Sequence, residues 1–128
     1  MSDILSVHTN VLKEIKDLSN IDEVVMNLTG RKLKQLKPKY IGKAGYLLKA
    51  IEISGELVGN YYEHKSTVLD DKIKIQRNDT ARLERLGEDT HHVDRKLLKL
   101  LREKSELIHR YSDYMIASMD LRVTTISK

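Results

Sequence analysis

The C-terminal third of the chain repeats apolar residues every three or four positions. When Leu83 is taken as the first core position of a heptad, every "d" position is aliphatic or aromatic: Leu86, Val93, Leu100, Leu107, Tyr114 and Leu121. The position after "d" is also apolar in three heptads, at Leu101, Ile108 and Met115. This pattern predicts a long helix over 89–122 that buries one broad face against other helices.

The N-terminal part shows the same periodicity over shorter stretches. Apolar residues from Ile4 to Leu18 predict a first helix over about 3–18, and those from Val24 to Leu36 predict a second. We expect the second helix to stop near Lys37, because a residue before proline disfavours the helical conformation. Gly30 is expected only to weaken its middle, by about 1 kcal/mol. The chain therefore begins with a helical pair, 1–37, followed by a basic loop, 38–45.

The middle of the chain predicts another long helix, 46–86, with a break at 87–89. Gly87 can end a helix, and Asp89 or Thr90 can start the next one. Two alternatives stay open, since Gly59-Asn60 can also end a helix and 43–122 can form one uninterrupted rod. The predicted fold class is all-α: a single domain, 1–128, built as an elongated helical bundle or coiled-coil hairpin with short N-terminal helices.

Charge is concentrated in one part of the chain. The net charge is +4, yet residues 31–51 hold seven Lys or Arg and no acid, whereas residues 1–30 carry −3 and residues 52–128 carry zero. Such a cluster attracts polyanions or an acidic protein surface, and tyrosine can stack on unpaired bases. The candidate residues for nucleic-acid or acidic-partner binding are Arg31, Lys32, Lys34, Lys37, Lys39, Tyr40 and Lys43.

Composition and spacing argue against several other functions. Without cysteine the chain forms neither a disulfide nor a thiolate metal site. Glu88-x-x-His91 and Glu106-x-x-His109 match a spacing used in di-iron bundles, but starts 18 residues apart lie about 27 Å apart on a helix. No Ser-His-Asp order or cofactor loop stands out. We expect no catalysis, metal, cofactor or small-molecule substrate.

Location is predicted from the same composition. The first residues lack the basic and apolar regions of a secretion signal, and the uncharged stretches are too short to span a bilayer. We expect a soluble protein of the cytoplasm or another intracellular compartment, of cellular or viral origin, with no membrane partner.

The broad apolar face gives the predicted function. Apolar residues after "d" make the face wider than one neighbouring helix covers, so we expect a homodimer or higher oligomer, a protein partner, or both. The function is that of a non-enzymatic helical adaptor or assembly protein in a larger complex. The predicted interface residues are Leu97, Leu100, Leu101, Leu107, Ile108, Tyr111, Tyr114 and Met115. The alternative is a nucleic-acid-binding accessory protein that uses the basic segment, residues 31–49.

Overall fold

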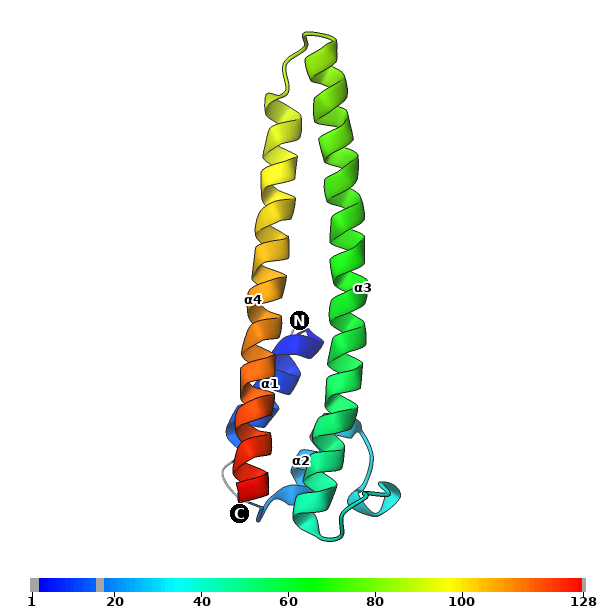
Figure 1. Cartoon of the computed structure of the whole chain (residues 1–128), viewed down its shortest axis with the longest axis vertical. Helices are drawn as coiled ribbons and strands as arrows, with labels where there is room; N and C mark the ends of the chain where they lie inside the picture. The colour runs from blue at the N-terminus through cyan, green and yellow to red at the C-terminus, as the bar shows by residue number, and fades with distance from the viewer. Residues whose placement is uncertain (1–2, 16–17, 128) are drawn as a thin grey trace. The chain divides into compact units, whose positions relative to one another are not determined.

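The helices α3 and α4 dominate the fold and pack against each other as a helical hairpin (Figure 1). The computed structural model describes residues 3–15 and 18–127, and within these residues it contains helices and no strand. The elements are α1 (Ile4–Glu14), α2 (Ile21–Thr29), the 3-10 turn η1 (Leu33–Gln35), α3 (Lys43–Arg85) and α4 (His91–Ser127). The prediction of an all-α hairpin with short N-terminal helices is confirmed.

The chain divides into two compact units. The first unit comprises Met1–Tyr61 and Arg110–Lys128, and the second comprises Tyr62–His109. The first therefore holds α1, α2, η1, the start of α3 and the end of α4. The prediction of a single domain stays a prediction.

Helix α1 is held at its start by Asp3. The Asp3 carboxylate accepts a hydrogen bond from the Ser6 N–H (3.0 Å), which caps the helix, and also pairs with the Arg110 guanidinium of α4. The helix ends at Glu14, because Ile15 is already extended (φ −75°, ψ 115°). The predicted end at residue 18 was wrong; residues 16 and 17 lie outside the described residues.

Helix α2 ends much earlier than predicted. Gly30 adopts a left-handed conformation (φ 70°), and its N–H donates to the Met26 carbonyl at 2.7 Å. Glycine adopts this conformation at no steric cost and commonly terminates helices in this way. Gly30 is thus a helix terminator rather than a weak point inside a longer helix, and the chain continues into η1.

Helix α3 runs through Gly55 and Gly59 without a break, so the alternative in which Gly59-Asn60 ends a helix was wrong. A methyl group at Gly59 would meet nothing within 4 Å, and one at Gly55 would lie 3.9 Å from the Tyr114 hydroxyl. Neither glycine is required by a close helix approach.

The predicted break between the long helices is confirmed in residues 86–90. Gly87 has φ 70°, its N–H donates to the Glu84 carbonyl (3.1 Å), and the Glu88 N–H donates to the Leu83 carbonyl (2.9 Å). This pair of bonds is a Schellman motif. Helix α4 then starts with the Asp89 carboxylate accepting from the His91 N–H (3.0 Å) and extends to Ser127, past the predicted residue 122.

Candidate functional site

The predicted interface residues of α4 fall into three groups by exposure. Leu107 and Tyr114 are only 3% and 1% exposed, so they belong to the chain's own core and not to a free surface, which corrects the sequence-based assignment. The half-buried members are Leu97, Leu100 and Tyr111. The exposed members are Leu101, Ile108 and Met115. Those three are the positions that made the apolar stripe unusually broad.

Helix α4 also exposes apolar residues that the heptad assignment missed. These residues belong to the first unit, and together with Met115 we call them the outward face of α4. Each is 43–66% exposed: Met115, Ile116, Met119, Val123 and Ile126. Met119 and Val123 each stand two residues from the buried Leu121, about 200° around the helix, so they point away from the core. The signal was present in the sequence as the spacing three, four, three from Ile116 to Ile126.

The core side of α4 contains a polar cluster that joins three helices. The Ser54 hydroxyl of α3 lies 2.6 Å from His8 Nδ1 of α1 and 2.9 Å from the Tyr114 hydroxyl of α4, at hydrogen-bond distance from each. The His8 and Tyr114 rings meet edge to face with centroids 6.5 Å apart. No sequence pattern predicted this cluster, because its three members are far apart in the chain.

Burial shifts the proton affinities of this cluster. Loss of water around the imidazole lowers the pKa of His8 below its ordinary 6.5, since burial disfavours the charged form. Burial raises the pKa of the Tyr114 hydroxyl, while its hydrogen bond with Ser54 acts in the opposite direction. A serine beside a histidine resembles a nucleophile and its base, but the Ser54 side chain is fully buried in this structure. The cluster links α1, α3 and α4 inside the core of the first unit.

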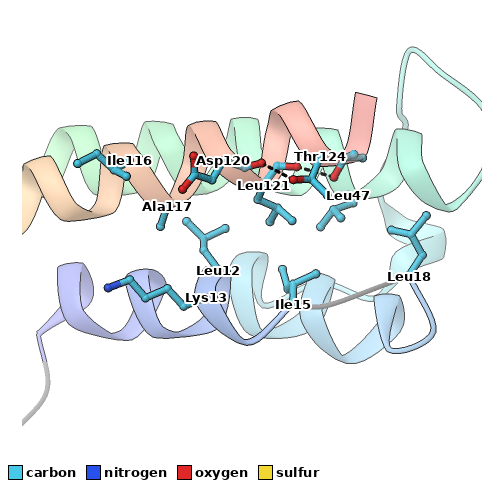
Figure 2. Close-up of a pocket in the computed structure, with 11 residues that line it drawn as sticks. Leu12, Lys13, Ile15, Leu18, Leu47, Ile116, Ala117, Asp120, Leu121 and Thr124 are labelled. Carbon is cyan, nitrogen blue, oxygen red and sulfur yellow. Dashed lines mark hydrogen bonds between the residues drawn. The ribbon is translucent and has the colours of Figure 1, made fainter. Parts of the chain in front are cut away.

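A pocket of about 310 Å³ lies between the end of α1, α3 and the end of α4 (Figure 2). Leu12, Leu47 and Leu121 form its apolar walls, with Lys13 and Asp120 at opposite sides. The hydroxyls of Thr124 and Thr125 donate hydrogen bonds to the backbone carbonyls of Asp120 and Leu121 in the same helix. The described lining thus offers apolar contact and no group of converging catalytic side chains.

The basic segment is displayed at the surface of the first unit. All seven predicted binding residues in it, from Arg31 to Lys43, are exposed. Leu36 is buried and Leu33 half-buried, and these two leucines attach the segment to the core. Lys49 is half-buried and pairs with Glu52 at 3.4 Å, so it is the least available cation of the segment.

The basic segment borders a groove, which we call the α2 groove. The apolar residues of its lining are Met26 of α2, Leu33 of η1 and Tyr46 of α3, and its volume is about 580 Å³. Lys32 and Lys34 line it together with Asp22 and Glu23 of α2. An apolar and aromatic lining with a few charged groups is the usual composition of a ligand site.

Two further searches concern metals and membranes. Within residues 3–15 and 18–127, no three His, Asp or Glu side chains are grouped so that they could hold a metal ion. No helix in this described part combines the length and apolar composition needed to cross a bilayer.

Comparisons of this chain with protein-family models, with curated proteins and with solved structures find no match. Any functional conclusion therefore depends on the residues and geometry of the chain itself.

Proposed function

We propose that this protein is a non-enzymatic helical assembly protein, which forms a homo-oligomer through the outward face of α4 and holds a protein partner in a larger complex. The observation that carries the proposal is the two-sided apolar character of α4. Tyr114 and Leu121 are buried on one side, while Met119 and Val123 are exposed on the other. A helix that is apolar on both sides is normally covered on both sides.

The second unit supports the same proposal. Among its residues, Tyr62–His109, only Ile73 and Leu107 are buried apolar side chains. Its two helical segments also expose Ile75, Leu98 and Leu101. Two helices alone leave much of their apolar surface in water, and a further helix from another chain would remove that surface at about 25 cal/mol per Å² before entropy is subtracted.

A second copy is the occupant that the outward face fits best. The positions Ile116, Met119, Val123 and Ile126 have the same spacing in both directions along the helix. An antiparallel copy related by a two-fold axis would place Ile116 opposite Ile126 and Met119 opposite Val123. Every layer would then pair two apolar side chains, which is the self-complementarity that a two-fold interface requires.

The test is the molecular mass in solution, measured by light scattering during gel filtration. We expect a multiple of the 14.8 kDa chain mass for the wild type. Met119→Glu/Val123→Glu places two charges in the outward face and should give the single-chain mass. The matched control is Thr124→Glu, an exposed position next to Val123 that is about 140° from Met119 around the helix axis.

Circular dichroism checks that each variant keeps its helices, so that loss of mass is not loss of fold. A wild-type protein that is a single chain at micromolar concentration would rule out the homo-oligomer. Equal dissociation by the Thr124 variant would rule out the outward face as the interface.

A further inference from the structure

We infer that the basic segment together with the α2 groove forms a binding site for single-stranded nucleic acid. This inference goes beyond assembly, because it adds a ligand at a different surface of the first unit. It is carried by three observations: a cluster of exposed cations outside any described ion pair, an exposed aromatic ring beside them, and a groove with a tyrosine in its lining.

The positive charge of the segment is only partly offset by nearby acids, since Asp22 and Glu23 share the α2 groove with Lys32 and Lys34, and Lys49 pairs with Glu52. The exposed cations are Arg31, Lys32, Lys34, Lys37, Lys39 and Lys43. None of them forms an ion pair with another described residue, and residues 31–51 contain no acid. Six such cations within 13 residues match a polyanion, whose charges also follow one another along a chain. Contacts between these cations and its phosphates release counterions, which favours binding.

The aromatic ring is presented for stacking. Tyr40 is 61% exposed, and the Lys39 ammonium lies 6.0 Å from the centre of its ring. A tyrosine with a cation beside it is the combination that single-strand-binding proteins use, with the base on the ring and the phosphate on the cation. Ile41, which is fully exposed next to it, adds apolar surface for the same base.

The α2 groove provides a second position for a base. Tyr46 and Leu33 offer a flat and an aliphatic surface, and Lys32 and Lys34 in the same lining can pair with the phosphates of the backbone. Asp22 and Glu23, also in the lining, can accept hydrogen bonds from the amino groups of a base. Bases reach such a groove only when they are unpaired, which favours a single strand over a duplex.

The experiment measures binding of fluorescent oligothymidylate and oligouridylate of about 20 nucleotides, longer than most single-strand sites, by anisotropy. We expect affinity to fall steeply as salt rises. Lys32→Ala/Lys34→Ala should reduce the salt slope by about 1.4 and the affinity by about 20-fold at 0.1 M salt, because each lost phosphate contact contributes about 0.7 to the slope. Tyr40→Ala should weaken binding by about tenfold with little change of slope, and Tyr40→Phe should restore it.

The matched control removes the same charge elsewhere. Lys72→Ala/Lys74→Ala changes two exposed lysines of α3 in the second unit, and it should leave binding nearly unchanged. An equal loss with this control would show that only net charge matters and would overturn the site. So would the absence of binding to both oligonucleotides near 0.1 M salt, or unchanged binding by Tyr40→Ala.

Two other ligands are tested in parallel. Tighter binding to a duplex of the same length would overturn the assignment to single strands. Co-sedimentation with phosphatidylserine vesicles, without binding to either oligonucleotide, would assign the exposed Tyr40 and Ile41 to a membrane surface instead.

Discussion

Ser54 of α3 and Tyr114 of α4 bring their hydroxyl oxygens to 2.9 Å in the buried core of the first unit. Tyr114→Phe removes one hydroxyl and leaves Ser54 with His8 alone. We expect the free energy of unfolding to fall by about 1 kcal/mol, the usual net value of such a hydrogen bond. Urea denaturation measures it, and Tyr40→Phe is the control because Tyr40 is exposed. An unchanged midpoint for Tyr114→Phe would mean that this bond contributes nothing to stability.

The burial of His8 predicts a stability that depends on pH. Its pKa is lowered in the folded state, so below pH 6.5 the unfolded chain binds the proton first. The His8 contribution is therefore complete above 6.5 and is lost as the pH falls below that value toward the lowered pKa. Urea midpoints of the wild type and of His8→Gln, followed from about pH 7.5 to 5, should converge as the pH falls. A constant difference between the two proteins would contradict the prediction.

Two glycines predict opposite effects of the same substitution. Gly87 has φ 70° with open space around it, so Gly87→Ala should destabilise the protein by about 1 kcal/mol through backbone strain alone. Gly59 lies inside α3 with nothing within 4 Å, and Gly59→Ala should stabilise it by about 0.5–1 kcal/mol. Thermal melts of the two variants give the comparison. A gain of stability with Gly87→Ala would refute the role of Gly87 in ending α3.

Lys104 lies three heptads after Leu83, so this polar residue of the second unit occupies the same core position of the repeat. Its ammonium pairs with Asp70 of α3, and both side chains are partly exposed, so the pair contributes only about 0–1 kcal/mol. Lys104→Leu replaces it with apolar burial and should raise the melting temperature. Lys74→Leu, an exposed position nearby, should not. A lower melting temperature for Lys104→Leu would show that the ion pair stabilises the hairpin more than an apolar contact does.

Helical periodicity was enough to predict the hairpin, because α3 and α4 carry regular apolar spacing over many turns. The turn at 86–90 was equally predictable, since Gly87 and Asp89 have strong local preferences. The end of α2 was not predicted. Apolar residues continue with helical spacing past Gly30, and the left-handed conformation of that one residue outweighs the pattern.

The candidate surfaces were predicted in part. The basic segment could be predicted from the distribution of charge alone, and its seven candidate residues are exposed. The apolar residues of α4 were predicted from periodicity. Periodicity alone does not say which of them the chain buries itself and which stay exposed. Tyr114 contacts Ser54, which in turn contacts His8. Because these residues come from distant segments, the burial of Tyr114 could be seen only in the structure.

The uneven distribution of buried residues has a consequence for amide hydrogen exchange. Most buried apolar side chains belong to the first unit, for example Leu5, Val25, Leu47 and Ile51. In the second unit only Ile73 and Leu107 are buried. The free energy of local opening follows such burial. Backbone deuterium uptake should therefore begin around Gly87 and spread toward Tyr62 and His109, and any chain that docks on the hairpin should slow it there first.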